Sequence, residues 1–308
     1  MANNFLEMSR SLRLYCPSLD IFLAQQFIRD AYRQICDRRP WSGLRAENQI
    51  LFQNQKTTGT VTVVNNSTTV TGSGTTFAST DVGRQFKAGV GSPIYTITAV
   101  DVGLQTLTTD LAIGIASASG LSFTIFDGYV TMPTDFKKLI VAVDPQTGYK
   151  LRHWVTQDQL LRWDPQRNFF GLPYALVDRR YNSSGVVQYE AWPYSTSQRV
   201  VSYFYTKQAA DLVNDTDTPI WPIRSDVIVS RALADLCRWP GVADQPNLMA
   251  SGPNAEYNRR SYLAEFEDKM VDLERQDEEI YMTWLSDTDW YGWPWAPLSA
   301  NFLQSHAV

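Results

Sequence analysis

The residue types that most often perform catalysis or bind metals are scarce and scattered in this chain. It contains two histidines, His153 and His306, and three cysteines, Cys16, Cys36 and Cys237. A nucleophilic device built on histidine would need one of these two imidazoles, and no cysteine lies near another in the sequence. An odd number of widely spaced cysteines also suggests no disulfide framework. We therefore expect no catalytic residue, no metal ligand, no cofactor and no enzymatic activity.

Acidic side chains offer the other route to chemistry, because two carboxylates about 5–9 Å apart can hydrolyse a glycosidic bond. The candidates for such a pair are Asp135, Glu190, Asp211 and Asp215. The sequence gives no distance between them, and no nucleophile or positioned base can be named beside them. Residues 214–217, Asn-Asp-Thr-Asp, are typical of a turn, and they lack the twelve-residue pattern of a calcium loop.

Composition limits the possible classes of protein further. The chain has 308 residues, about two domains' worth, of which 44% are hydrophobic and 19% charged. This supports a sizeable folded core rather than a disordered chain. The net charge of −5 argues against a dedicated nucleic-acid binder. No apolar run is long enough for a transmembrane helix, and the first residues do not resemble a signal peptide, so we expect a product made in the cytoplasm.

The first zone of the chain, residues 1–55, is helical in character. Apolar residues recur at three- and four-residue spacings from Leu19 to Ile35, which predicts an amphipathic helix. Ser18 or Asp20 can cap its start, and Pro40 ends it.

The second zone, residues 56–127, is rich in Thr, Ser, Gly and Val and poor in charge. Alternating β-branched residues separated by Asn, Gly and Ser predict strands and turns. The pair Gly72 and Gly74 precedes no helix, so it is not a phosphate loop. We expect a compact inserted β-module with strands at 59–64, 68–71, 85–88, 95–100, 105–108 and 122–126.

The third zone, up to residue 283, mixes short strands with helices. We expect strands at 139–143, 149–154, 186–191 and 199–205, and helices at 156–163, 225–239 and 254–284. Ser225 can cap the second of these helices. The sequence thus predicts an α+β fold in which residues 1–55 and 128–283 form a helix bundle with short strands. The β-module at 56–127 is inserted into it, and residues 284–308 form an extended C-terminal arm.

Two charged surfaces have two interpretations each. Arg29, Arg33, Arg38 and Arg39 are either a solvated helix face or a contact for an acidic partner. The acidic residues of the helix at 254–284, from Glu265 to Glu279, are either solvated or paired with basic groups of a neighbouring subunit. Acidic groups near a helix C-terminus are unfavourable for the helix dipole.

The terminal segment, residues 284–308, combines aromatic side chains with prolines and a glycine that prevent a regular helix. Such a segment cannot build its own core, and Trp and Tyr contribute strongly to protein interfaces. It either folds back on its own domain or docks on another chain. The residues that we expect to bind a partner are Trp284, Trp290, Tyr291, Trp293, Trp295 and Phe302.

Several short phrases resemble a known family. After the N-terminal helix come Val130-Thr-Met-Pro-Thr-Asp-Phe136, Asp144-Pro145, Tyr189-Glu-Ala-Trp-Pro193, Val201-Ser-Tyr-Phe-Tyr205 and Ile220-Trp-Pro-Ile-Arg-Ser-Asp-Val227. This order is similar to that of the head–tail adaptor proteins of tailed bacteriophages, also called connector or head-completion proteins. The resemblance extends from Ser18 to Met282. The β-module, with Thr69-Val-Thr-Gly-Ser-Gly-Thr-Thr-Phe77, looks like an insert that recurs in phage structural proteins.

The resemblance implies a structural virion protein with a helical adaptor core. Such proteins form a ring, usually a dodecamer, between the portal and the tail tube or nozzle. DNA passes through the lumen without specific binding, and no membrane is involved. It also implies that the aromatic C-terminal arm reaches the portal. The resemblance therefore implies that the protein is assembled in the host cytoplasm and is located in the neck or tail of the virion. In such a ring each subunit makes the same heterologous contact with the next until the ring closes. An acidic lumen would not bind the DNA that passes through it, because binding DNA requires basic groups that contact the phosphates.

An alternative function is that of a tail-associated binding module whose β-insert recognises a receptor or a glycan. Receptor binders usually present aromatic side chains on loops. The aromatic residues of the insert, Phe77, Phe86, Tyr95, Phe123 and Phe126, fall mostly within expected strands. This favours a docking platform for neighbouring tail proteins.

Overall fold

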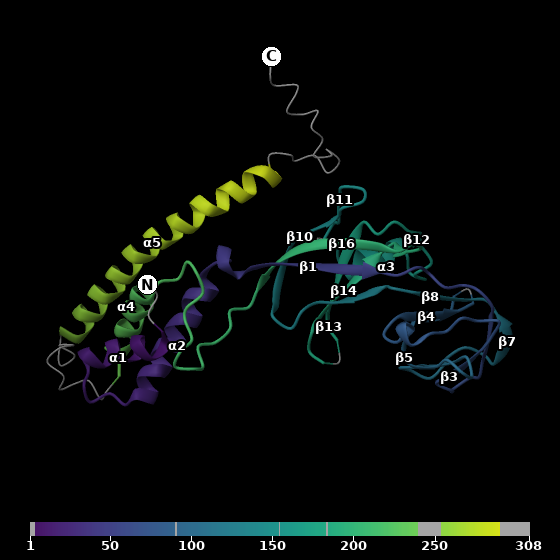
Figure 1. Cartoon of the computed structure of the whole chain (residues 1–308), viewed down its shortest axis with the longest axis horizontal. Helices are drawn as coiled ribbons and strands as arrows, with labels where there is room; N and C mark the ends of the chain where they lie inside the picture. Colours follow the sequence, from purple (N-terminus) through teal and green to yellow (C-terminus); the bar gives the residue numbers. More distant parts are fainter. Residues whose placement is uncertain (1–3, 90, 154, 183, 240–253, 290–308) are drawn as a thin grey trace, which may run out of the picture. The chain divides into compact units, whose positions relative to one another are not determined.

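The computed structural model describes residues 4–89, 91–153, 155–182, 184–239 and 254–289, with the backbone alone for Arg180, residues 254–258 and residues 279–289. The chain divides into two compact units (Figure 1). The helical unit comprises Met1–Ala46 and Thr206–Gly292, and the β unit contains Glu47–Tyr205. The chain therefore leaves the helical unit once, forms the β unit and returns.

The helical unit contains α1 (Phe5–Tyr15), α2 (Ile21–Arg38), α4 (Ser225–Leu236) and α5 (Asn254–Asp289), with a short 3-10 turn at Ser42–Leu44. Asp20 caps α2 by accepting a hydrogen bond from the Phe22 amide at 3.0 Å, which confirms one of the two expected caps. Ile28, Ile35 and Leu233 are fully or almost fully buried in one core shared by these helices. α5 contributes Phe266, Met270 and Leu273 to the same core, at the spacing of one helix face.

Three small sheets form one part of the β unit. The first has the order β1–β16–β10–β11, the second β13–β14–β9, and the third pairs β12 with β15 in parallel. Their bounds are β1 (Arg45–Phe52), β9 (Tyr129–Thr131), β10 (Phe136–Asp144), β11 (Tyr149–Lys150), β12 (Phe170–Gly171), β13 (Ala175–Tyr181), β14 (Val187–Trp192), β15 (Tyr194–Ser195) and β16 (Arg199–Lys207). One short helix, α3 (Gln157–Trp163), packs against β13.

A seven-stranded sheet with the order β7–β2–β3–β6–β5–β4–β8 forms the other part. Its strands are β2 (Thr60–Val63), β3 (Thr69–Ser73), β4 (Gln85–Ala88), β5 (Tyr95–Asp101), β6 (Thr106–Thr109), β7 (Ala118–Leu121) and β8 (Phe123–Phe126). A 3-10 turn at Ser79–Asp81 comes before β4 in the chain. Alternate residues of its strands point inward, and Val61, Val63 and Val70 are buried in a hydrophobic core that belongs to this sheet alone.

Polar contacts join the seven-stranded sheet to the rest of the β unit. The guanidinium of Arg84 pairs with Asp81 at 3.1 Å and with Asp127 at 2.7 Å, and it donates to the Asn54 carbonyl. The ammonium group of Lys87 donates to the Gln166 carbonyl at 2.6 Å. Desolvation at this position lowers the pKa of Lys87.

The predicted helix-bundle core with short strands is wrong. Residues 47–205 are built mainly from sheets, one of them seven-stranded, and among the described α-helices only α3 lies in that range. The error lies in treating the strands after residue 128 as additions to a helical core. Val201, Tyr203 and Tyr205 of β16 alternate with less buried residues, so this strand packs one face of a sheet and not a helix bundle.

Single elements differ from expectation in smaller ways. Residues 45–52, expected in the helical zone, form β1, because Ile50 and Phe52 are buried with a period of two. Arg224, and not Ser225, occupies the N-cap of α4. α5 continues to Asp289, so residues 284–289 are helical and not part of an extended arm. The strand at 85–88 is confirmed as β4 with the same bounds. No helix in the described residues is long and apolar enough to span a bilayer.

Candidate functional site

The six aromatic residues predicted to bind a partner cannot be grouped as a site. Trp284 belongs to the described backbone of α5. The other five, Trp290, Tyr291, Trp293, Trp295 and Phe302, lie outside the described residues.

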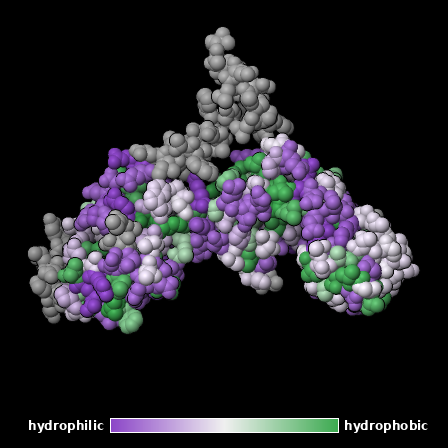
Figure 2. Space-filling view, viewed as in Figure 1, coloured by the Kyte–Doolittle hydropathy of each residue, from purple (hydrophilic) through white to green (hydrophobic). Residues whose placement is uncertain are grey.

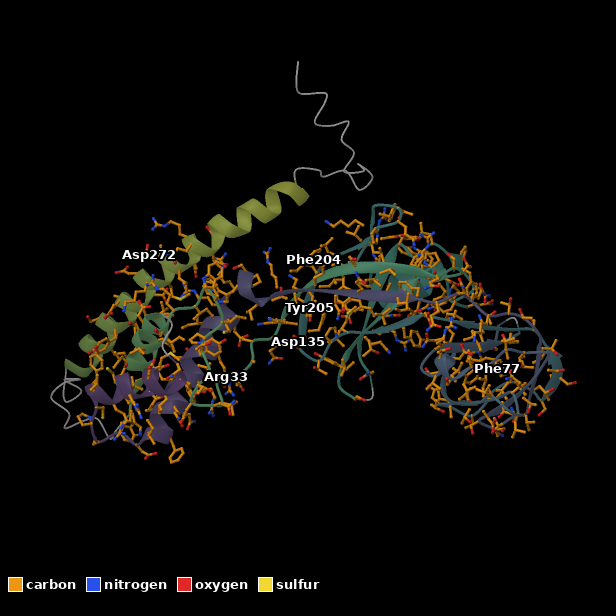
Figure 3. The ribbon with its side chains drawn as sticks, viewed as in Figure 1. Arg33, Phe77, Asp135, Phe204, Tyr205 and Asp272 are labelled. Atoms are coloured by element: carbon orange, nitrogen blue, oxygen red, sulfur yellow. The ribbon has the colours of Figure 1, made fainter. Side chains whose placement is uncertain are left out.

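Three of the five phrases that carry the family resemblance come together in the β unit. β9 pairs with β14, which places Val130 opposite Tyr189. The Phe136 ring stacks on Tyr205, with ring centres 5.5 Å apart, and meets Tyr189 edge-to-face at 5.9 Å. The Tyr205 hydroxyl lies 3.1 Å from Oδ1 of Asp135 (Figure 3). We call Asp135, Phe136, Tyr189 and Tyr205 the motif cluster.

Glu190, a candidate catalytic acid from the second phrase, is fully engaged in structural contacts. Its side chain is 2% exposed. Oε1 accepts hydrogen bonds from the Arg167 guanidinium and from the Tyr194 hydroxyl, both at 2.7 Å, and Oε2 accepts from Gln157 at 3.2 Å. Burial, followed by the nearby Glu190 charge, raises the pKa of Tyr194 well above its ordinary value. This carboxylate therefore holds strands and loops together and has no access to a substrate.

The candidate acids are divided between the two units. Asp211 and Asp215 belong to the helical unit, whereas Asp135 and Glu190 belong to the β unit. Arg33 of α2 binds both oxygens of Asp211, at 2.7 and 2.6 Å, and these hydrogen bonds hold the pKa of Asp211 below its usual range. Asp215 accepts a hydrogen bond from Gln25 at 3.0 Å.

The acidic run that contains Asp215 forms the expected turn at residues 214–216. Asp217 accepts the Val213 and Asn214 amides at 2.8 Å, and these contacts lower the pKa of Asp217.

Charged residues of α2 and α5 pair within the helical unit. Arg38 lies 2.8 Å from Glu267 and 3.1 Å from Glu274. Arg39 lies 3.6 Å from the buried Asp277 and 3.4 Å from Glu278. Neither interpretation of the two charged surfaces anticipated that they would pair with each other, since both interpretations assigned the charges to solvent or to another chain.

One cluster with a nucleophile and an amine was missed by the sequence analysis. The Lys269 ammonium of α5 lies 2.7 Å from the Ser230 hydroxyl of α4 and 2.6 Å from the Glu265 carboxylate. These residues line a groove of about 370 Å³ together with Leu14, Tyr15 and Tyr262. No sequence signal links Ser230 to Lys269, because they come from different helices. The Lys269 ammonium is thus shared between Ser230 and Glu265, and this contact joins α4 to α5.

The described residues contain no group of three or more His, Cys, Asp or Glu side chains arranged to hold a metal ion. Burial, together with the charges of Lys150 and Lys138, lowers the pKa of His153. The three cysteines are buried and form no disulfide, and burial raises the pKa of the Cys237 thiol. The three cysteines therefore have the environment of core residues.

One cavity of the β unit is lined by residues of several sheets. It measures about 540 Å³ and is lined on one side by Asn48–Gln53 of β1 and the residue that follows it. The other walls come from Tyr129–Pro133, at and after β9, and from the turn that holds Thr80 and Val82–Arg84. We call this cavity the β1–β9 slot.

Comparison with known proteins adds no relative. A scan against protein-family models found no match to the chain, and a search of curated proteins found none either.

Proposed function

We propose that this chain is a non-catalytic subunit of a phage head-to-tail connector, a ring between the portal and the tail through which DNA passes. The observation that carries the proposal is the motif cluster. Three phrases that resemble the adaptor family, separated by up to about 70 residues, meet in one aromatic and hydrogen-bonded contact. Their convergence supports treating them as parts of one structural plan and not as chance matches.

The surface of the helical unit offers apolar side chains for assembly. Leu14 is 76% exposed and Phe22 is 77% exposed. Figure 2 shows small apolar patches among polar residues on the visible face of both units. Side chains of this size at contact surfaces contribute about 1.5–3 kcal/mol each when they are fully buried. They are suited to the repeated contact between ring subunits.

The receptor- or glycan-binding alternative is less well supported. Phe77, Phe86, Tyr95 and Phe123 of the inserted module are all buried in its core, where Phe77 meets Phe123 edge-to-face at 5.5 Å. Aromatic side chains in a core cannot stack on a sugar ring. A docking platform for tail proteins agrees better with this burial.

Ring formation is the first test of the proposal. Native mass spectrometry and electron microscopy of the purified chain, alone and mixed with its portal, should reveal a closed ring, expected to be a dodecamer. A chain that remains monomeric at all concentrations with and without the portal contradicts the proposal.

The portal contact is the second test. We propose that Trp284, Trp290, Tyr291, Trp293, Trp295 and Phe302 supply it. Truncation after Asp289 preserves the whole of α5 and should abolish co-purification with the portal while leaving the melting temperature nearly unchanged. Changing Trp293 and Trp295 to Ala should reproduce the loss. The matched control is Tyr181→Ala, which removes an exposed aromatic side chain from the β unit. Unaltered portal affinity of the truncated chain overturns this contact.

A further inference from the structure

A strip of exposed basic side chains follows β10, β11 and the residues just after β11. Its members are Lys137, Lys138, Lys150 and Arg152. β10 and β11 are antiparallel neighbours, with Val143 opposite Lys150. Burial, followed by the charges of Lys150 and Lys138, lowers the pKa of His153, so both ammonium groups lie near the same imidazole. The strip is thus a local concentration of positive charge in a chain whose net charge is −5.

The carboxylate nearest to this strip in the β10–β11 hairpin is directed elsewhere. Asp144 is the one acidic residue between Lys138 and Lys150 in the sequence, and its side chain is 1% exposed. It accepts hydrogen bonds from Arg199 at 2.8 Å and from the Gln146 amide at 2.9 Å. Neither Lys138 nor Lys150 forms an ion pair with a described residue. Their charges therefore remain available to an anionic ligand.

Exposed aromatic rings lie beside the end of the strip. The guanidinium carbon of Arg152 lies 6.0 Å from the centre of the Tyr174 ring, and Tyr174 meets Trp192 edge-to-face at 4.9 Å. Trp163, the last residue of α3, lies 5.5 Å from Trp192 at an angle of 34°, and Phe169 meets Trp192 edge-to-face at 6.2 Å. Trp192 is 7% exposed, whereas Trp163 is 45% and Phe169 is 57% exposed. Because Trp192 packs against one side of the Trp163 ring, the exposed part of that ring faces away from it.

Hydrogen bonds fix the loop that carries Phe169. The carboxylate of Asp164, 3% exposed, accepts the Phe169 amide at 3.0 Å and the Trp192 indole N–H at 3.2 Å. Arg167 has a φ of 55°, in the left-handed region that residues other than glycine rarely adopt. Its guanidinium donates to Glu190 at 2.7 Å and to the Asp164 carbonyl at 2.6 Å, which holds this conformation in place. Strain that the surroundings maintain is common at binding sites, and a fixed ring loses little freedom on binding.

The two parts of this surface suit two parts of one ligand. We call Lys138, Lys150, Arg152, Trp163 and Phe169 the basic–aromatic surface. Its cations attract phosphate oxygens, and its open ring faces stack on flat rings such as nucleobases. A single strand presents both groups, whereas a duplex conceals the faces of its bases. An acidic peptide would pair with the cations but would leave the two exposed rings without a flat partner.

We propose that the basic–aromatic surface binds single-stranded nucleic acid without sequence preference. The two lysines and Arg152 contact phosphates, and one base stacks on each of Trp163 and Phe169. With so few phosphate contacts, binding is confined to this one surface and depends strongly on salt. The proposal goes beyond the connector function and does not rest on it, because a duplex that passes through a lumen does not expose its bases.

Fluorescence anisotropy with the full chain and a labelled oligothymidylate of about 12 nucleotides tests the phosphate contacts. Changing Lys138 and Lys150 together to Gln should weaken binding about tenfold or more at low salt. The slope of log K against log salt should fall by about 1.4, because each phosphate contact of a single strand contributes about 0.7. The matched control changes Arg10 and Arg13, two exposed charges of α1, to Gln and should leave affinity and slope nearly unchanged.

Ring variants test the stacking separately. Phe169→Ala should weaken binding about 5- to 150-fold without changing the salt slope. Trp163→Phe keeps a ring and should retain most of the affinity that Trp163→Ala loses. Tyr181→Ala, which removes a 70% exposed ring of β13, is the control and should bind like the unchanged chain. Thermal melting of each variant establishes that it is folded.

The competing ligands decide the outcome. An oligouridylate of the same length distinguishes RNA from DNA as the source of the strand, and tighter binding of either supports the proposal. Equal affinity for a duplex of that length overturns it, and full competition by oligoglutamate overturns it in favour of an acidic protein partner. Absence of binding at low salt, or binding that the lysine and Phe169 variants leave intact, also overturns it. These measurements do not involve ring formation, so their failure leaves the connector proposal standing.

Discussion

The ion pairs of the two units differ in burial. In the helical unit the pairs between the end of α2 and α5 include Glu267, 52% exposed, and Glu278, 62% exposed, whereas Asp277 beside Arg39 is fully buried. In the β unit Arg84 is 4% exposed, Asp81 is fully buried and Asp144, which binds Arg199 at 2.8 Å, is 1% exposed, whereas Arg162 and Asp158 pair on the surface. Both units thus hold exposed and buried pairs, and Arg38 and Arg84 stand near the two ends of this range.

Burial determines how much stability is lost when a charged residue is removed. An exposed ion pair contributes about 0–1 kcal/mol, because water screens it. Breaking a buried pair costs about 3–5 kcal/mol, because the remaining charge stays desolvated. Substitutions of Arg38 and Arg84 should therefore differ several-fold in effect.

Arg84→Ala should have the largest effect. It leaves Asp81 fully buried with Lys56 at 2.7 Å as its remaining cationic partner, and it removes the partner of Asp127. We expect the β unit to lose about 3–5 kcal/mol of unfolding free energy. This loss of unfolding free energy is measured by urea unfolding followed by hydrogen exchange, with peptides of each unit analysed separately. A loss below about 1 kcal/mol, the range of an exposed pair, would remove the distinction between the two arginines.

Glu190→Gln should rank second. The amide keeps the shape of the side chain but removes the charge that faces Arg167, which is only 12% exposed. Hydrogen bonds to charged groups contribute about 1.5–3 kcal/mol, so we expect a loss of about 2 kcal/mol. The same exchange experiment reports it, with Glu267→Gln on exposed α5 as the matched control that should change little.

Alkaline pH should destabilise the β unit through its buried tyrosines. Burial, together with the charges of Tyr205 and Asp135, raises the pKa of Tyr203 to about 12. A raised pKa in the folded state means that stability is complete below about pH 10 and falls as pH rises toward 12. The loss from this tyrosine is at most about 1.4 kcal/mol at pH 11. Tyr203→Phe should flatten this part of the stability curve, and absorbance at 295 nm should follow the titration.

Arg38→Ala should have the smallest effect. Its guanidinium is 37% exposed and pairs with Glu267 and Glu274 across the surface of the helical unit. We expect a loss of less than about 1 kcal/mol, reduced further in high salt. Thermal unfolding at low and high salt checks this. A loss as large as that of Arg84→Ala would show that exposure is not what separates the two arginines.

Local sequence patterns predicted elements better than architecture. β4 and α3 follow from alternation and from a capping threonine, Thr156, which are properties of a few neighbouring residues. The sheet that contains β1, β10 and β16 could not be foreseen, because its strands are distant in sequence and their pairing depends on side chains that meet only in the fold. The contacts of Arg38 with α5 and of Ser230 with Lys269 are non-local in the same sense.

The site was predictable to the same limited extent. The phrases around Phe136 and Tyr189 are visible in the sequence, but no local pattern indicates that both pack on Tyr205. The β1–β9 slot was not foreseen at all, because residues 45–52 were assigned to the helical zone. A period of two set by Ile50 and Phe52 was the signal that could have identified this strand.

The position of the β unit within the helical unit has a consequence for synthesis on the ribosome. α1 and α2 are made first, but α4, which packs against both, follows about 190 residues later. At roughly 5–20 residues per second, the apolar faces of α1 and α2 wait about 10–40 s for their partner. The β unit can fold during this interval. Ile28 and Ile35, which end fully buried, are therefore exposed to chaperones or to other nascent chains before the helical core can close.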